Sequence, residues 1–293
     1  MPVSFAERLA LGTAQFGLDY GLNNLHGRPD DATVQAILAA AAEAGVSMLD
    51  TASAYGDSEV RLGVFGEQTS TLEVVTKLAG APPAEVTQQL HTSLTRLRRR
   101  SVYGVLLHRF ENLQQYPESW QALIAAQKDG LTQRIGVSLY HPAQARWLLS
   151  SDLGVDLVQV PFNVFDQRFA PLLPELATRG VEVHVRSAFL QGLLLRDLTT
   201  LPAFFEPLRP KLQQLHSLAN EANIPLEAML LLFATQTPDV ARVVIGVDSV
   251  DNLRANVAAG AYADTARQLR PHLLALAEPT DQFILPYTWP PTR

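Results

Sequence analysis

Short runs of apolar residues alternate with longer amphipathic stretches from one end of the chain to the other. Several runs, such as Val102–Leu107, are apolar at consecutive positions, which is typical of strands covered on both faces. Short apolar runs bounded by turn residues predict strands. The predicted strands are Leu9–Leu11, Val46–Leu49, Leu72–Thr76, Val102–Leu107, Arg134–Ser138, Leu157–Pro161, Val181–Val185 and Arg242–Gly246.

The stretches between these runs carry apolar residues at three- and four-residue spacing, the period of a helix with one buried face. Gly45, Gly130, Gly154 and Gly180 each stand between such a stretch and the next strand, where a helix commonly ends. The predicted helices are Asp31–Ala44, Ser58–Phe65, Ala84–Arg99, Glu118–Lys128, Pro142–Leu149, Pro171–Thr178, Leu208–Glu221, Pro225–Thr235, Asp251–Ala259 and Thr265–Leu276.

Regular alternation of strands and helices predicts a parallel sheet, because parallel neighbours need a long crossover connection. Eight units fit a closed (β/α)8 barrel, or TIM barrel, and an open doubly wound sheet is the alternative. No linker, low-complexity segment or change of composition divides the chain. We therefore expect a single α/β domain over residues 1–293, with its functional site at the carboxyl ends of the strands.

The composition narrows the classes of protein. A net charge of −6 with mixed acids and bases argues against a nucleic-acid surface, and the cluster at Arg96 and Arg98–Arg100 fits a solvated helix end. The absence of cysteine excludes disulfides, thiolate metal sites and a thiol nucleophile. The first residues lack the pattern of a secretion signal, and no apolar run approaches the roughly 18 residues of a membrane span. We expect a cytoplasmic protein that binds neither nucleic acid nor membrane.

Four chemically active side chains stand at the ends of three neighbouring predicted strands. Asp50 ends the second strand and Tyr55 lies in the loop after it, while Lys77 and His108 end the third and fourth. Each residue alone has an ordinary structural reading, such as a turn former or a surface lysine. Because strand ends converge at one rim of a barrel, the set together predicts a proton-transfer site.

The chemistry of these side chains fits that task. A tyrosine has an ordinary pKa of about 10, and a neighbouring ammonium lowers it towards neutrality. A carboxylate beside the ammonium keeps the lysine charged and in place. A histidine can donate a hydrogen bond to a carbonyl oxygen and orient it.

The strings LDTASAYGDSE, VVTKL and VLLH together are similar to the aldo-keto reductase signature, and LGTAQFG resembles that family's first-strand motif. The resemblance runs from Leu11 to Asn256. It implies Tyr55 as general acid, Lys77 and Asp50 as its tuning pair, and His108 as the group that orients the carbonyl. It also implies a small-molecule carbonyl substrate, a monomer, and hydride transfer from NADPH, with NADH as the alternative.

The cofactor contacts implied by the resemblance depart from the family pattern at three places. Ser138 is followed by Leu139 where relatives have Asn, and Arg186 replaces an aromatic residue that stacks on the nicotinamide. A planar guanidinium can stack as well. After the eighth strand the usual 2′-phosphate cations are replaced, Asp248 adds a negative charge, and only Arg254 is near, so we expect a small preference for NADPH. The implied contacts are Gly12, Thr13, Ser138, Gln159, Arg186, Ser187, Phe189, Gln191, Gly192, Gly246, Asp248, Ser249, Asn252 and Asn256.

Two other classes of protein remain as alternatives. A cofactor-binding regulatory protein with little turnover would show a damaged set of catalytic residues, and this set is intact. A metal-dependent barrel hydrolase or lyase needs His and carboxylate ligands at several other strand ends, where only Asp50 and His108 are found. Loop or helix-surface positions are expected for His26, His91, His184 and His216.

The substrate pocket is predicted from residues in the loops after the first, fourth and fifth strands. They combine aromatic surface with a cation, which suits a sugar-like or acidic carbonyl compound. The C-terminal string FILPYTWPPTR either packs on the barrel exterior or borders this pocket. The candidate pocket residues are Phe16, Leu18, Tyr20, Arg109, Phe110 and Tyr140.

Overall fold

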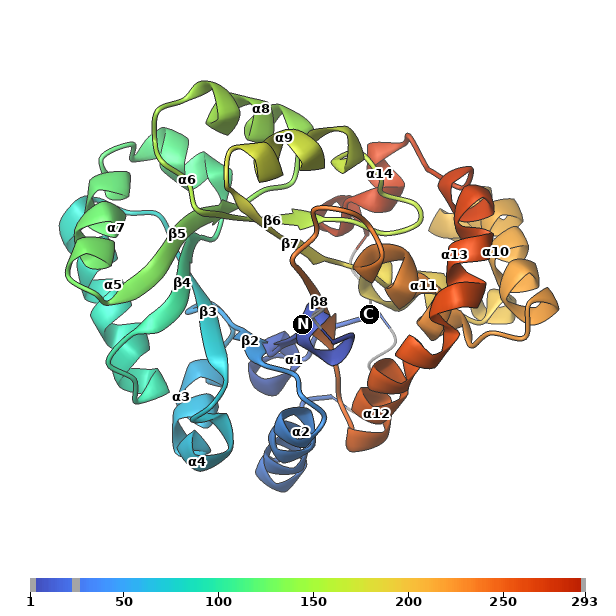
Figure 1. The fold of residues 1–293 in the computed structure, drawn as a ribbon, viewed down its shortest axis with the longest axis horizontal. Helices are drawn as coiled ribbons and strands as arrows, with labels where there is room; N and C mark the ends of the chain where they lie inside the picture. Colours follow the sequence, from blue (N-terminus) through green and yellow to red (C-terminus); the bar gives the residue numbers. More distant parts are fainter. Residues whose placement is uncertain (1–3, 23–26, 291–293) are drawn as a thin grey trace.

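Eight parallel strands close into a barrel in chain order in the computed structural model, which describes residues 4–22 and 27–290 (Figure 1). The first and last strands pair in register, with Gly12 opposite Gly246. Closure confirms the predicted (β/α)8 barrel and shows that the open-sheet alternative is wrong. The strands are β1 (Leu9–Gly12), β2 (Met48–Asp50), β3 (Glu73–Leu78), β4 (Val102–Leu107), β5 (Thr132–Ser138), β6 (Leu157–Pro161), β7 (Glu182–Arg186) and β8 (Arg242–Gly246).

Helices surround the barrel, and every predicted helix is found with its ends within a few residues of the prediction. The longer helices are α2 (Asp31–Glu43), α3 (Ser58–Val64), α5 (Pro83–Leu97), α7 (Ser119–Lys128), α8 (Pro142–Ser150), α9 (Leu173–Thr178), α10 (Arg209–Glu221), α11 (Leu226–Thr235), α12 (Val250–Ala258) and α13 (Ala263–Leu274). The short ones are α1 (Ala14–Gly17), α4 (Gly66–Thr69), α6 (Phe110–Gln115) and α14 (Asp281–Ile284). Turns of 3-10 helix are η1 (Ala6–Arg8), η2 (Ala170–Leu172), η3 (Leu190–Leu195), η4 (Leu198–Thr200), η5 (Ala203–Leu208), η6 (Ala259–Tyr262) and η7 (Pro286–Thr288).

Local sequence signals set several helix ends. The side chains of Asp30 and Ser249 accept hydrogen bonds from the backbone of the first turns of α2 and α12, respectively. The four glycines that separate helices from strands all have a positive φ, a conformation that other residues adopt at a cost. These ends fix where each strand begins and therefore which residues reach the far rim. Across the described part of the chain, no helix combines the length and apolarity needed to cross a membrane.

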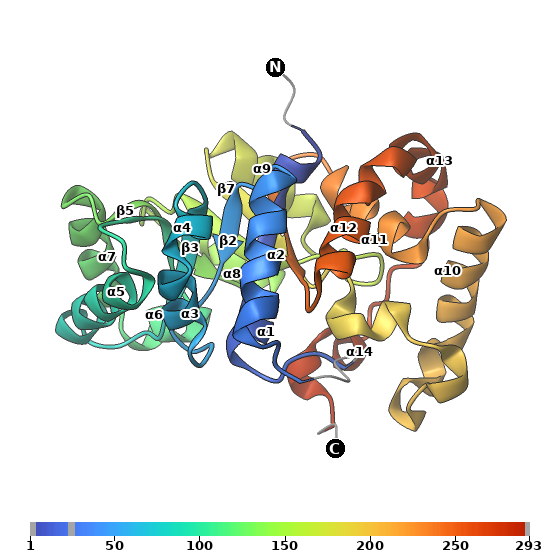
Figure 2. The ribbon, with the colours of Figure 1, turned by 90° about the horizontal axis from the view of Figure 1, so that it is seen from below.

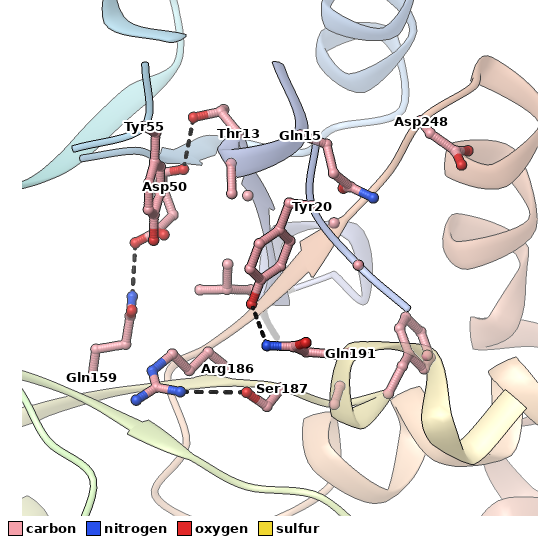
Figure 3. Close-up of a pocket in the computed structure, with 18 of the residues that line it drawn as sticks. Thr13, Gln15, Tyr20, Asp50, Tyr55, Gln159, Arg186, Ser187, Gln191 and Asp248 are labelled. Carbon is pink, nitrogen blue, oxygen red and sulfur yellow. Dashed lines mark hydrogen bonds between the residues drawn. The ribbon is translucent and has the colours of Figure 1, made fainter. Parts of the chain in front are cut away.

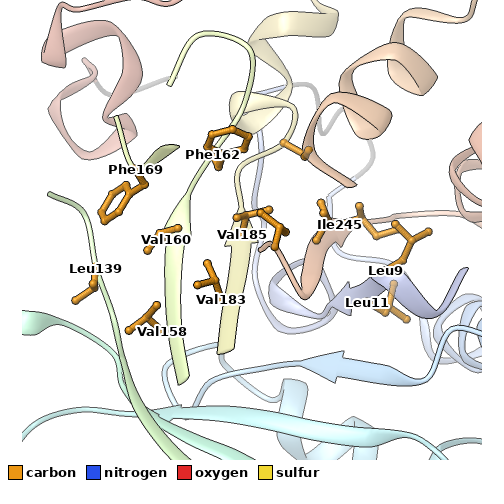
Figure 4. Close-up of a cluster of buried hydrophobic side chains, with 14 of the residues drawn as sticks. Leu9, Leu11, Leu139, Val158, Val160, Phe162, Phe169, Val183, Val185 and Ile245 are labelled. Carbon is orange, nitrogen blue, oxygen red and sulfur yellow. The ribbon is translucent and has the colours of Figure 1, made fainter. Parts of the chain in front are cut away.

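Two layers of apolar side chains hold the barrel. Outward-facing strand residues pack against the helices, among them Val158 and Val160 of β6 and Val183 and Val185 of β7 (Figure 4). Inward-facing residues from five strands form a smaller cluster inside the barrel. That inner cluster consists of Ala10, Met48, Val75, Leu106 and Leu157. Alternation of the two sets along each strand directs the inward residues at the strand ends towards one cavity.

A polar cluster lies at the opposite end of the barrel, where the strands begin. Glu182 of β7 accepts hydrogen bonds from the Tyr103 phenol and binds the Nε2 atom of His184, which lies 2.7 Å away. His184 is completely buried, so the predicted surface position is wrong: it alternates with the outward Val183 and Val185 and therefore faces the interior. His91 is exposed and His216 is half-buried on their helices, as predicted, and His26 lies outside the described residues.

Candidate active site

A cavity of about 280 Å³ opens at the carboxyl ends of the strands. Its wall contains three of the four predicted catalytic residues, Asp50, Tyr55 and His108, whereas Lys77 lies behind the wall. Ser249 also lies outside it, as the cap of α12. The predicted cofactor contacts in the wall are Gly12, Thr13, Ser138, Gln159, Arg186, Ser187, Phe189, Gln191, Gly192, Gly246, Asp248, Asn252 and Asn256.

Lys77 and Asp50 form a buried ion pair from the adjacent strands β3 and β2. The Nζ atom of Lys77 lies 2.6 Å from the Oδ1 atom of Asp50 and also donates to the Thr51 carbonyl at 3.0 Å. Burial alone would lower the pKa of Lys77, but the charge of Asp50 and the nearby Tyr55 phenol outweigh it and raise that pKa. The ammonium is therefore fixed in its charged form, and it lies 5.2 Å from the centre of the Tyr55 ring.

The second oxygen of Asp50 is also occupied. It accepts a hydrogen bond of 2.7 Å from the Nε2 atom of Gln159, which comes from β6 on the far side of the barrel (Figure 3). Gln159 is 1% exposed, yet it contributes to the cavity wall. Asp50 thus fixes two side chains at once, the lysine behind Tyr55 and an amide that faces the cavity.

His108 follows β4 and stands beside Tyr55. The two ring centroids are 5.7 Å apart and the planes are nearly perpendicular, at 82°. Burial, followed by the charge of Lys77, lowers the pKa of His108 to about 4. The imidazole is therefore neutral at pH 7, with one nitrogen that donates and one that accepts.

Tyr55 is positioned by a close backbone approach between the loops after β1 and β2. A Cβ atom added to Gly17 would lie 1.8 Å from the Tyr55 carbonyl oxygen, and one added to Gly56 would lie 2.4 Å from the Gly17 carbonyl oxygen. Gly56 also has a φ of +55°, which favours glycine. Ser58 ties the same loops together, because its hydroxyl bonds the carbonyl and hydroxyl oxygens of Thr13 at 3.0 and 2.8 Å.

Arg186 ends β7 and reaches across β6 to the end of β5. Its guanidinium stacks on the Tyr140 ring at 4.1 Å from the centroid. One terminal nitrogen donates to the Leu139 carbonyl at 3.2 Å and the other donates to the Ser187 hydroxyl at 3.4 Å. The side chain is therefore held in one orientation, with part of its surface in the cavity wall.

The loop after β7 bonds to the loop after β1 and forms a clasp, which we define as Tyr20, Leu22, Gln191 and Arg196. The Gln191 side-chain amide donates to the Tyr20 hydroxyl at 3.3 Å (Figure 3). The Gln191 backbone carbonyl accepts from the Leu22 backbone N–H at 3.1 Å. Arg196 donates to the Leu22 carbonyl at 3.3 Å. Ser187, Leu190, Gln191 and Gly192 all have a positive φ, so this part of the cavity wall follows a left-handed path.

The opposite end of the cavity lies at the first turn of α12. Asn252 and Asn256 of this helix reach the wall beside two half-buried carboxylates, Asp248 and Glu227. Arg254, the nearby cation noted in the sequence, is exposed and lies 3.7 Å from the Asp251 carboxylate. Within the described residues, this end of the wall therefore has two acids and neither a lysine nor an arginine.

Only two of the six candidate substrate residues line the cavity, Tyr20 and Tyr140. Phe16 is completely buried in the layer between barrel and helices, and Phe110 packs on Trp147 at 5.3 Å. Leu18 and Arg109 are exposed outside the wall. Prediction from the sequence missed wall residues supplied by loops, by α1 and α11 and by strand β8: Ala14, Gln15, Gly21, Ala188, Leu195, Glu227 and Val244.

The described part of the C-terminal segment packs on other elements and contacts one wall residue, but none of its own residues lines the cavity. The Trp289 ring packs on Phe205 at 4.9 Å, away from the cavity. The Tyr287 ring lies 5.1 Å from Tyr140, a wall residue, and its hydroxyl is 2.9 Å from His141. Figure 2 shows α14 towards the same end of the barrel as α1, which directly follows β1. Residues 291–293 of the string lie outside the described residues.

Comparison with known proteins identifies the family. The model of the Aldo/keto reductase family matches residues 8–269, so the chain belongs to that family. It is 36% identical to an aldo-keto reductase of Mycolicibacterium vanbaalenii over 164 residues, which are 54% of this chain and 57% of that protein. It is 32% identical over 110 residues to an uncharacterised oxidoreductase of Schizosaccharomyces pombe, covering 37% and 40% of the two chains. The match thus spans about half the length of these curated relatives.

Solved structures of the family share the fold. An aldo-keto reductase from Bacillus halodurans, in its holo form, has a TM-score of 0.78 at 21% identity, covering 93% of each chain. A glycerol dehydrogenase from Gluconobacter oxydans has a TM-score of 0.73 at 22% identity, covering 98% of this chain and 94% of that one. At this level of identity the two structures support the barrel fold of this chain. Its substrate has to be inferred from the side chains that line its own cavity.

Proposed function

We propose that this protein is a carbonyl reductase that uses NADPH or NADH to interconvert an aldehyde or ketone with the corresponding alcohol, with Tyr55 as the proton donor. One observation carries the proposal: Asp50, Tyr55 and His108 line one cavity, with the neutral imidazole of His108 beside Tyr55 and the ammonium of Lys77 buried behind it in an ion pair with Asp50. When bound, the reduced nicotinamide supplies the hydride.

Each of the four residues has a task that follows from its surroundings. Tyr55 holds the proton that the carbonyl oxygen takes, and the positive charge of Lys77 stabilises the phenolate that remains. Asp50 keeps Lys77 charged inside the barrel. Because His108 is neutral, it donates an N–H to the carbonyl oxygen without competing for the proton.

The other residues in the wall fit a nicotinamide dinucleotide. Ser138 and the Gln159 amide carbonyl offer hydrogen bonds to a carboxamide near the catalytic end. The left-handed loop at Gln191 and Gly192 lines the cavity, and the first turn of α12 presents backbone N–H groups that suit an anionic group. Gly246 keeps the wall open, because a Cβ atom there would lie 2.5 Å from the Gln15 side-chain oxygen. Asn252 and Asn256 complete the far end.

The direct test follows NADPH absorbance at 340 nm with a panel of aldehydes, using wild type, Tyr55→Phe and the control Tyr116→Phe, whose phenol lies outside the cavity wall. Tyr55→Phe should lower kcat/KM on the order of 10²-fold or more, as expected for loss of a general acid, with the Kd for NADPH little changed. Retention of more than about a tenth of the wild-type rate would contradict the role of Tyr55. Tight NADPH binding without turnover of any aldehyde would instead support a regulatory or sensor protein.

A further inference from the structure

Arg186 is the one lysine or arginine in the cavity wall among the residues that the structure describes. Across that same part of the chain, no carboxylate lies within ion-pair distance of its guanidinium. The side chain is half-buried. A partly desolvated charge without a counter-ion is costly, and an anionic ligand that reaches it regains that energy.

The contacts of Arg186 fix its orientation and leave capacity for a ligand. Tyr140 covers one face of the guanidinium at 4.1 Å, and the Leu139 carbonyl and the Ser187 hydroxyl accept one hydrogen bond each. A guanidinium has five N–H donors in a planar fork, which matches a carboxylate bidentately. A group held this way binds an anion at little further cost in side-chain entropy.

Arg186 lies at the catalytic end of the cavity. Figure 3 shows it beside Gln159, whose amide donates to Asp50. After burial and the charge of Lys77, the charge of Arg186 is among the causes that lower the pKa of His108, so it disfavours protonation of the proposed carbonyl-orienting group. The carboxylates Asp248 and Glu227 stand in the wall where it meets α11 and α12. The charge pattern therefore favours an anion near His108.

We infer that Arg186 selects carbonyl substrates that carry a carboxylate, such as oxo acids or aldehyde acids, and that it binds this carboxylate while the carbonyl oxygen meets Tyr55 and His108. This inference rests on the proposed reductase function. It makes Arg186 a specificity-determining residue, with Tyr140 as the platform that holds it. If Arg186 instead packs against the nicotinamide, its loss affects cofactor binding and every substrate alike.

The test compares two pairs of nearly isosteric aldehydes, 3- and 4-carboxybenzaldehyde and the corresponding formylbenzamides, which differ in charge. In wild type, kcat/KM should favour the acids. Arg186→Gln should lower the acid-to-amide ratio of kcat/KM by about 10- to 100-fold, the range of a lost charge-assisted hydrogen bond, and Arg186→Lys should restore part of it. The matched control is Arg109→Gln, which removes a nearby exposed cation outside the wall and should change the ratio less than about threefold.

A second measurement needs no turnover. Calorimetric titration with benzoate and benzamide should show benzoate binding about tenfold or more weaker in Arg186→Gln, with benzamide binding the same in both proteins. An unchanged acid-to-amide ratio or an unchanged benzoate Kd would overturn the inference, and so would a loss of NADPH affinity that accounts for all of the effect. Failure of wild type to reduce any aldehyde would count against the proposed reductase, while the benzoate titration would still decide the role of Arg186.

Discussion

The ammonium nitrogen of Lys77 lies 2.6 Å from a carboxylate oxygen of Asp50, and the two side chains are 1% and 4% exposed. A pair buried this deeply is stable only while both charges are present, because either charge alone in the interior is poorly solvated. The pair is therefore part of the folded core as well as of the proposed active site.

Lys77→Met should lower the free energy of unfolding by about 3–5 kcal/mol at pH 7, because it leaves Asp50 as an uncompensated buried charge. Aldehyde reduction should be lost as well. Urea unfolding at pH 7 measures the loss of stability.

The control is Arg267→Met, which breaks an exposed ion pair with Asp264 and should change stability by less than about 1 kcal/mol. Equal losses in the two variants would show that burial of the Lys77–Asp50 pair has no energetic consequence.

His108 should make the protein less stable as the pH falls from about 6.5 to about 4. Its pKa is lowered to about 4 in the folded protein, mainly by burial, so over this range the unfolded chain binds a proton that the folded protein does not. Stability therefore decreases with decreasing pH. Relative to His108→Gln, wild type should lose about 1–2 kcal/mol between pH 6.5 and 4.5 in urea unfolding. The control is His91→Gln, on the exposed face of α5, whose stability should depend on pH as that of wild type does. An equal pH dependence of stability in His108→Gln and His91→Gln would contradict the lowered pKa of His108.

Gly17→Ala should displace Tyr55, because the added Cβ atom would lie 1.8 Å from the Tyr55 carbonyl oxygen, part of a backbone that cannot rotate away. We expect a loss of about 1–3 kcal/mol in stability and a lower kcat. The matched control is Gly66→Ala in α4, where no atom lies within 4 Å of the added group and the backbone is helical. Thermal unfolding and aldehyde turnover should be close to wild type in Gly66→Ala; a fully active Gly17→Ala protein would show that the loops separate without moving Tyr55.

The preference for NADPH over NADH should be small, with a ratio of kcat/KM below about 10². The wall at α12 presents Asp248 and Glu227 and, among the described residues, no lysine or arginine to a 2′-phosphate. Asp248→Ser and Glu227→Gln should each raise the ratio several-fold by removing repulsion, and fluorescence titration with both cofactors should show the same trend in Kd. Asp251→Ser, in the first turn of α12 but exposed and outside the wall, is the control. A wild-type ratio of about 10³ would mean that a cation reaches the phosphate.

The barrel and the place of the four candidate catalytic residues could be predicted because both depend on local patterns. Consecutive apolar residues mark buried parallel strands, and the residue that ends such a run lies at the carboxyl rim, as Asp50 and His108 do. The resemblance to the family then supplied the candidate cofactor contacts, most of which line the same cavity.

Side-chain direction within loops and strands could not be read in the same way. Phe16 and Phe110 follow strands one and four but turn into the outer core, where apolar burial outweighs a place in the cavity. Glu227 reaches the wall from α11, an element whose position depends on tertiary packing. His184 has an interior partner two residues away, Glu182, that periodicity alone does not reveal.

The Glu182 cluster has a consequence for how alkaline inactivation should be understood. Burial and the hydrogen bond to Glu182 raise the pKa of Tyr103 to about 12, so the folded protein retains a proton that the unfolded chain releases near pH 10. The free energy of unfolding therefore decreases as the pH rises from about 10 to about 12. The group responsible lies at the end of the barrel opposite the candidate active site. If activity declines in that range because the protein unfolds, the decline should be slow and cooperative, and Tyr103→Phe should prevent it. Ionisation of a catalytic group would instead lower activity immediately and reversibly. The time course of inactivation thus distinguishes damage to the scaffold from inhibition of the chemistry.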